Sequence, residues 1–254
     1  MPSQREPRIF YRKEVDSTQD EAFRLLDSGE VPPFFVVSDI QTSGRGRYHR
    51  PWVSGRGGAW LTLLLEQDRK KFHNAWVYGF AASLSVVELL SEFKIRASIS
   101  WPNDVLVNGS KISGVLAEAR LNGNEKAIEE TESGHPLAVG VGLNVTNDVS
   151  RVAAPYPVTN MLDNLKSSID FESVRKRLIE ILFIRAFNGE QDLTIKEYRT
   201  KLQTLGRVVT VKSGNWMISG KAVDLDSDGA LIIRTDKGLE KVFTGEIVRK
   251  RTQG

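Results

Sequence analysis

Short apolar runs and helix-spaced apolar stripes alternate along most of the chain. The runs Phe34–Ser38, Ala59–Leu65 and Leu137–Val145 have the length and composition of buried strands. Apolar residues recur every three or four positions over 76–93 and 171–182. That spacing places them on one face of a helix, so it predicts two helices that pack against a core.

The beginning of the chain predicts a strand over Arg8–Arg12 followed by a helix. Thr18 and Glu21 have the spacing of a capping box, in which the first residue caps the helix. Gly29 follows the last apolar positions and is typical of a helix end. The helix is therefore expected to run from about Thr18 to just before Gly29.

A stiff turn and a hairpin are predicted near the middle of the chain. In Trp101-Pro102-Asn103-Asp104, the proline fixes its own φ and favours an extended residue before it. The dipeptide Asn108-Gly109 separates two apolar runs and is a strong hairpin signal. Residues 121–135 read as a polar loop.

The pattern changes at Gly206. A last short helix carries Tyr198, Leu202 and Leu205, and only short strands follow it. Even spacing with Gly and Asp turns predicts a small β-barrel with a domain boundary near residue 204. The predicted strands of this barrel are Arg207–Lys212, Trp216–Leu225, Ala230–Thr235 and Leu239–Phe243.

The composition is that of a soluble globular protein, with 254 residues, 40% hydrophobic and 26% charged. No run of 18 apolar residues is present, and the polar N-terminus lacks the apolar segment of a secretion signal. The chain has no cysteine, which excludes disulfides and thiol catalysis. None of its three histidines pairs with another at helical spacing, so a compact zinc site is not expected. A cytoplasmic protein is expected.

Charge is unevenly distributed, although the net charge is only +3. Residues 40–65 contain four arginines and no acid, whereas 125–135 are acidic. The acidic stretch is interpreted as a solvated loop. The basic stretch contains Gly44-Arg45-Gly46-Arg47, which suits a phosphate or a carboxylate but is also compatible with an exposed turn. It is neither a Walker A loop nor a dinucleotide fingerprint.

Three other short motifs are each open to two interpretations. Asp104 can contact Mg²⁺ or a ligand, or can simply form an Asx-turn between strands. Gly114 follows Lys111-Ile-Ser, and Gly140-Val-Gly142-Leu-Asn144 ends an apolar strand. Such glycines indicate either a close approach to a ligand or a bulge.

Taken together, these motifs resemble those of the biotin protein ligases. The strings that carry the resemblance are Asp16-Ser-Thr18, Gln41-Thr-Ser-Gly-Arg-Gly-Arg47, Trp52, Trp101-Pro-Asn-Asp104, Lys111-Ile-Ser-Gly114 and Gly140-Val-Gly-Leu-Asn144. The resemblance implies an α+β fold in which a mixed β-sheet is flanked by helices, with a C-terminal SH3-like barrel. Residues 1–204 would be the catalytic domain and 205–254 the barrel. Few residues precede Ile9, as in the short class without a DNA-binding domain.

The resemblance implies that biotin and ATP form biotinyl-5′-AMP, with Mg²⁺, and that biotin then passes to a lysine of biotin carboxyl carrier protein. It assigns catalytic roles to Arg47, Lys111 and Asp104, with Asp104 also a Mg²⁺ contact. It places biotin at Ser17, Thr18, Gln41, Gly44, Arg45, Lys111, Gly114 and Gly142. It places ATP and the adenylate at Arg45, Arg47, Trp52, Asn103, Asp104, Lys111 and Asn144. A homodimer that binds neither DNA nor membrane is expected.

Four departures from the family pattern stand out. Ser100 replaces the usual Lys before Trp101, which removes one charge next to the phosphates. Gln19 replaces the usual Asn and is expected to affect only the helix start. Residues 48–51 vary, which makes Arg50 a weaker assignment, and the acidic loop 121–135 is longer than usual.

Two other functions compete with this one. A lipoate–protein ligase uses the same adenylate chemistry, but the combined motifs and the terminal barrel favour biotin. A non-enzymatic nucleic-acid-binding protein could use the Gly- and Arg-rich loop Thr42–Gly58, called the arginine loop below, together with the β-barrel. The mild net charge and the absence of interleaved aromatic residues in that loop argue against it.

Overall fold

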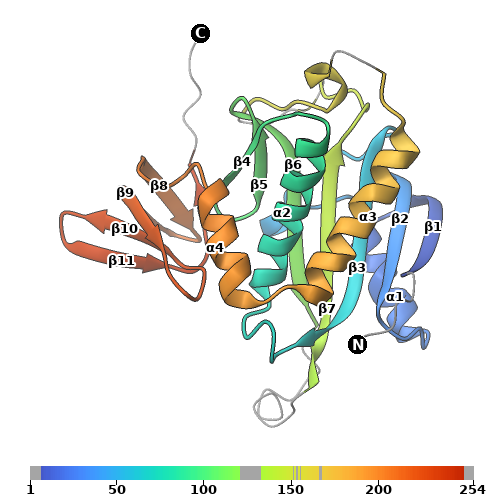
Figure 1. Ribbon diagram of the computed structural model, residues 1–254, viewed down its shortest axis with the longest axis horizontal. Helices are drawn as coiled ribbons and strands as arrows, with labels where there is room; N and C mark the ends of the chain where they lie inside the picture. The colour runs from blue at the N-terminus through green and yellow to red at the C-terminus, as the bar shows by residue number, and fades with distance from the viewer. Residues whose placement is uncertain are drawn as a thin grey trace.

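The computed structural model describes residues 7–120, 133–150, 152, 154, 156–165 and 168–248. Two sheets organise the fold (Figure 1). The large sheet contains, in spatial order, β1 (Arg8–Val15), β2 (Phe34–Gln41), β3 (Gly58–Asp68), β7 (Ser133–Asn144), β6 (Ser110–Ala119), β5 (Asp104–Val107) and β4 (Ala97–Ser100). β1 and β2 are parallel and the other neighbours are antiparallel, so the sheet is mixed as expected.

Helices cover the two faces of this sheet unequally. Alternate residues of a strand point to opposite faces, so each strand contributes to both sides. The larger core lies under α2 (Trp76–Glu92) and α3 (Phe171–Asn188), as Figure 1 shows. α1 (Thr18–Asp27) buries a smaller cluster on the other face, against β2, β3 and β7. Much of that second face is therefore left for the cavity described below.

The helix at the start of the chain is capped one residue earlier than the sequence predicts. Ser17 is the N-cap, and its Oγ accepts from the Gln19 N–H at 3.2 Å. Thr18 is the first helical residue and contacts Gln41 instead, so its assignment as the cap was wrong. The predicted end is confirmed, because Gly29 has a φ of +96° just after the C-cap.

The predicted hairpin is confirmed. Asn108 and Gly109 have φ values of +50° and +81° and connect β5 to β6 in antiparallel register. Of the acidic loop expected at 121–135, residues 121–132 lie outside the described residues. β7 begins at Ser133, so the last three residues of that expected loop belong to a strand.

The C-terminal strands form an open sheet rather than the closed barrel expected. β8 (Val208–Ser213), β9 (Trp216–Leu225) and β10 (Leu231–Thr235) make its centre, and β11 (Gly238–Val242) and β12 (Glu246–Ile247) are the two edges. Among the described residues the edge strands do not pair with each other, and β12 has only two residues with which to do so.

α4 (Gln191–Lys201) packs on α2 and leads into the C-terminal sheet. The expected short helix is thus present, but Leu202 is its C-cap and Leu205 lies beyond it. No helix in the described part of the chain is long and apolar enough to span a membrane.

Candidate active site

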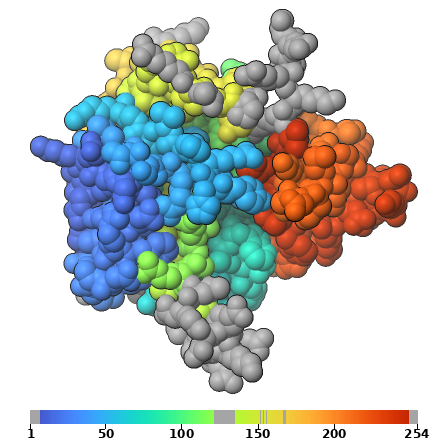
Figure 2. Space-filling view, turned by 180° about the vertical axis from the view of Figure 1, so that it is seen from behind, coloured from blue at the N-terminus to red at the C-terminus, as the bar shows by residue number. Residues whose placement is uncertain are grey.

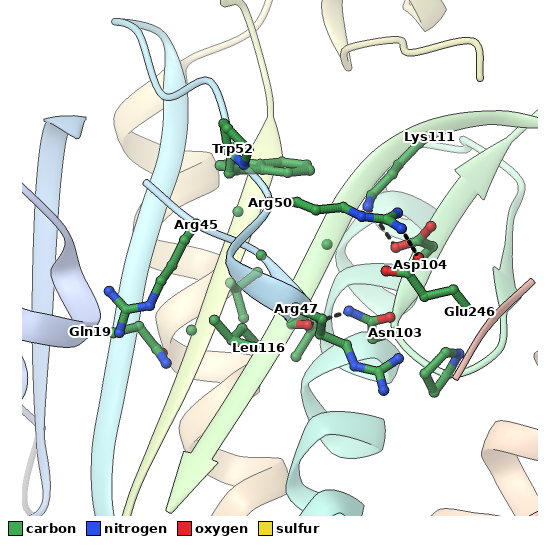
Figure 3. A pocket seen from close by; sticks show the side chains of 18 of the residues that line it. Gln19, Arg45, Arg47, Arg50, Trp52, Asn103, Asp104, Lys111, Leu116 and Glu246 are labelled. Carbon is green, nitrogen blue, oxygen red and sulfur yellow. Dashed lines mark hydrogen bonds and ion pairs between the residues drawn. The ribbon is translucent and has the colours of Figure 1, made fainter. Parts of the chain in front are cut away.

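A cavity lies on the sheet face that α1 leaves partly uncovered (Figure 3). Its floor includes Gly140 and Gly142 of β7 and Gly114 of β6. Gly114 and Gly142 are direct cross-strand partners. Because these positions carry no side chain on the cavity side, other groups can come close to the backbone there.

One end of the cavity is polar but carries no net charge of its own. Gln41 Oε1 accepts from the Thr18 N–H at 2.8 Å and from its hydroxyl at 3.1 Å. The Thr18 hydroxyl in turn accepts from Thr62 at 2.8 Å. Ser17 lies beside them at the helix start, where its Oγ accepts from the Gln19 N–H.

Arg45 borders this end and is neutralised within the protein. Its guanidinium is 2.5 Å from Asp20 and 3.0 Å from Glu118. The hydrogen bond to Asp20 raises the pKa of Arg45 above its ordinary value, and the charge of Glu118 adds to this effect. Arg45 therefore acts as a fixed wall of the cavity more than as a free cation.

The other end of the cavity is lined by the basic side chains of Arg47, Arg50 and Lys111. Lys111 Nζ lies 2.6 Å from the Asp104 carboxylate and 3.4 Å from the Tyr156 hydroxyl. The same ammonium is 5.1 Å from the centre of the Trp52 ring, in cation–π range. Figure 3 shows Arg50 and Glu246 beside this pair.

The arginine loop reaches this end because the C-terminal sheet holds it there. Arg47 donates to the Gly245 carbonyl at 2.7 Å and to the Thr244 hydroxyl at 2.8 Å. Arg50 forms an ion pair with Glu246 of β12. Residues far apart in sequence thus close one wall together.

Tyr48 and His49 form the tip of this loop, with φ values of +56° and +55°. The backbone turns back there, and Gly46 N–H donates to the Arg50 carbonyl at 2.8 Å. Trp52 then folds over the glycine floor. A Cβ on Gly142 would come 2.5 Å from Trp52 Nε1, a distance that no side chain tolerates.

The Trp-Pro-Asn-Asp turn is held against β6. Asn103 Nδ2 donates to the Val115 carbonyl at 2.6 Å, and the Val115 N–H donates back to the Asn103 carbonyl at 3.1 Å. This exchange fixes the start of β5, from which Asp104 extends into the cavity.

The structure brings eleven of the thirteen predicted site residues to the cavity wall. They are Ser17, Thr18, Gln41, Arg45, Arg47, Trp52, Asn103, Asp104, Lys111, Gly114 and Gly142. Gly44 and Asn144 are not part of the lining. A Cβ on Gly44 would lie 2.7 Å from the Trp52 carbonyl, so this glycine lets the loop close. Asn144 donates to the Thr159 carbonyl at 3.1 Å and braces a neighbouring loop.

Several cavity residues were not predicted. Gln19 was expected only to modify the helix start, yet it is buried in the wall next to Glu118. Tyr156 and Glu246 also line the cavity. Neither lies in a motif, so the sequence carries no signal for them. Arg50, the weaker assignment, lines the cavity, as does Ser100.

The carboxylates near the cavity determine how the protein could bind Mg²⁺. No group of three or more His, Cys, Asp or Glu residues in the described part of the chain is arranged to hold a metal. Asp104 supplies one carboxylate, already beside Lys111. One carboxylate together with substrate phosphates is the usual way in which proteins bind Mg²⁺, so the cavity fits a metal ion brought by a nucleotide.

Comparison with known proteins supports one assignment. The model of the biotin/lipoate A/B protein ligase family matches residues 11–129, and that of the biotin protein ligase C-terminal domain matches residues 204–250. The structure of the Aquifex aeolicus biotin protein ligase in complex with biotin and ATP superposes with a TM-score of 0.75. It is 31% identical in sequence, with 96% of this chain and 99% of that chain covered.

The chain belongs to the biotin protein ligase family. The biotin–[acetyl-CoA-carboxylase] ligase of Paracoccus denitrificans is 27% identical over 92% of this chain and 97% of its own length. The bifunctional ligase/repressor BirA of Bacillus subtilis is 26% identical over 94% of this chain and 73% of its own length. These similarities to biotin protein ligases extend over almost the whole chain.

Proposed function

We propose that this chain is a biotin–[biotin carboxyl carrier protein] ligase that forms biotinyl-5′-AMP from biotin and ATP. The observation that carries the proposal is the contrast between the two ends of this cavity. Its uncharged end, at Thr18 and Gln41, suits the ureido ring of biotin. Its cationic end, at Arg47, Arg50 and Lys111, suits a carboxylate beside phosphates.

The first step brings two anions together. A biotin carboxylate oxygen attacks the α-phosphorus of ATP, and pyrophosphate leaves with the electron pair of the broken bond. Lys111 and Arg47 would offset the charge that develops on the phosphate. Fixed charges of this kind are usually the largest catalytic contribution, and loss of one donor costs about 10²–10³ in kcat.

We propose that Mg²⁺ enters with ATP and that Asp104 is its protein ligand. When bound, the ion would neutralise phosphate oxygens and favour departure of pyrophosphate. Ser100 leaves this end one cation short of the family pattern, and Arg50 is placed where it could supply part of that charge.

The second step transfers biotin to a carrier lysine. The lysine amine attacks the acyl carbon of biotinyl-5′-AMP, and AMP leaves. The amine must lose a proton, because an unperturbed lysine has a pKa of about 10.4. Asp104 is the cavity carboxylate proposed to accept it, and no covalent enzyme intermediate is required.

The two alternatives fare less well. Lipoate has no ureido group to use the polar end, and the C-terminal match is to a biotin ligase domain. A nucleic-acid-binding role would need a basic outer surface. Arg47 and Arg50 instead line the cavity, where their contacts with Gly245 and Glu246 hold the loop against the C-terminal sheet.

Three further assignments are proposals of the same kind. We place the boundary between the catalytic domain, 1–204, and the C-terminal domain, 205–254, at the end of α4, and the reaction in the cytoplasm, where ATP is available. We also propose a homodimer. β1 is an edge strand with exposed Ile9 and Tyr11, a surface that suits pairing, and light scattering of the purified protein at micromolar concentration tests it.

The proposed function is tested by incubating the protein with ATP, Mg²⁺, biotin and an isolated biotin carrier domain. Intact mass spectrometry should show one biotinyl group added to the carrier. A carrier whose acceptor lysine is replaced by Arg is the matched control and should stay unmodified. Absence of any transfer to the native carrier would contradict the proposal.

A further inference from the structure

The side-chain amide of Gln19 is buried at the uncharged end of the cavity, and its carbonyl oxygen meets no hydrogen-bond donor among the described residues. The residue is 4% exposed. Its Nε2 donates to Glu118 Oε2 at 2.5 Å. Because a carboxylate only accepts, this contact fixes which end of the amide is nitrogen. Oε1 therefore faces away from Glu118, and no donor among the described residues reaches it.

The position of Oε1 depends on the glycine floor. A Cβ on Gly140 would come 2.4 Å from this oxygen. Any other residue at position 140 would thus take the space that the amide occupies. Gln19 and Gly140 both line the cavity, and Figure 3 shows the Gln19 side chain at its wall.

The neighbouring polar groups at this end already have partners. Gln41 Oε1 accepts two hydrogen bonds from Thr18, and Gln41 Nε2 donates to the Ser54 hydroxyl at 2.8 Å. Arg45 donates to Asp20 and Glu118. Gln19 Oε1 is the buried acceptor left without a donor at this end among the described residues. A ligand that satisfies it must carry an N–H or an O–H.

We propose that Gln19 Oε1 accepts a hydrogen bond from one ureido N–H of biotin and so acts as a specificity-determining residue. The inference rests on the proposed function and adds to it a recognition contact made by the residue that departs from the family pattern. The dithiolane ring of lipoate has no N–H. With lipoate bound, the oxygen would stay buried and unpaired, which disfavours that substrate.

The first test replaces Gln19 by Met, which keeps the length of the side chain and removes the acceptor together with the Nε2 donor to Glu118. Calorimetric titration should show about a tenfold loss of biotin affinity, the fold-change typical of one lost buried hydrogen bond. The affinity for ATP should not change. Gln67→Met is the matched control, because Gln67 is also buried but donates to the Phe72 and His73 carbonyls outside the cavity. It should bind biotin like the wild type.

The second test uses two biotin analogues, each methylated at one ureido nitrogen. The wild type should reject both. The ratio of analogue affinity to biotin affinity should be higher in Gln19→Met than in the wild type for one analogue and unchanged for the other, because Oε1 contacts a single N–H. If Gln19→Met does not fold, Gln19→Asn draws the oxygen back by one methylene and should give the same selective pattern.

Each outcome decides one point. Wild-type biotin affinity in Gln19→Met, or an equal loss for biotin and both analogues, would overturn the inference while leaving the proposed function intact. Failure of the wild-type protein to bind biotin at all would instead refute the proposed function.

Discussion

At the residue scale, the glycines of the cavity floor leave the space in which neighbouring side chains pack against the sheet. Gly114 and Gly142 within apolar strands indicated close approach of something to the backbone, and the structure places the Trp52 indole there. The role of Gln19 could not be predicted, because it depends on Glu118, 99 residues away in sequence. Motifs identify residues whose local conformation or chemistry is constrained. The residues that they contact are brought to them by the tertiary fold and cannot be read from the motif.

Substitution of Gly142 by Ala should impair biotin binding. The new methyl group would lie 2.5 Å from Trp52 Nε1 and would displace the indole. Overpacking of this kind costs about 1–3 kcal/mol, and if biotin binding bears this cost the Kd for biotin should rise by about 5- to 150-fold. Gly55→Ala is the control, since a Cβ there meets nothing within 4 Å. Unchanged biotin affinity in Gly142→Ala would show that the floor is not the biotin site.

Replacement of Arg47 by Ala should let biotinyl-5′-AMP escape. The variant loses a cation at the phosphate end and the contacts that hold the loop to Thr244 and Gly245. We expect the adenylate to dissociate at least about tenfold faster, as followed by rapid dilution and quenching. Arg56→Ala changes an exposed arginine of the same basic stretch and should retain the adenylate. Equal retention of biotinyl-5′-AMP by Arg47→Ala and Arg56→Ala would contradict the proposed role of Arg47.

At the element scale, local sequence signals predicted the hairpin and the end of α1 correctly, but they did not predict where α1 is capped. The hairpin at Asn108-Gly109 and the end of α1 at Gly29 follow from the positive φ that these residues tolerate. The cap of α1 was misplaced by one residue because Ser17 and Thr18 both have the chemistry of a cap. Thr18 is instead drawn to Gln41, a contact that local spacing does not encode.

Asp16, at the entrance to α1, gives this region a defined pH dependence. Hydrogen bonds from Arg24 and from the Ser17 N–H lower the pKa of Asp16 from 3.8 to about 2. Folding thus favours the charged form, and the resulting stability is present above pH 3.8 and is lost as the pH falls to about 2. Both side chains are about half exposed, so the pair contributes at most about 1 kcal/mol.

The substitution Asp16→Asn should therefore lower the free energy of unfolding by at most about 1 kcal/mol at pH 7. The gap from the wild type should narrow as the pH drops from about 4 to about 2. Urea denaturation across this range measures it. In an Arg24→Gln background, Asp16→Asn should add no further pH-dependent loss. A gap that is constant down to pH 2 would contradict the assignment.

At the scale of the whole molecule, the mixed sheet and the C-terminal strands were predictable but their assembly was not. Short strands with Gly and Asp turns indicated a barrel, yet closure depends on how β11 and β12 meet, and they remain separate edges. The open C-terminal sheet nevertheless has a function in the site. Through Thr244, Gly245 and Glu246 it holds the arginine loop over the cavity. The active site is therefore a product of both sheets.

The measurement that tests the central claim most directly is the exchange of labelled pyrophosphate into ATP by the purified protein with Mg²⁺, run with biotin and in parallel with lipoate. The account predicts exchange that depends on biotin and stays at background with lipoate. Exchange with lipoate alone would reassign the cavity to the other substrate. Exchange with neither acid would show that the cavity does not form an adenylate, and the claim would fail.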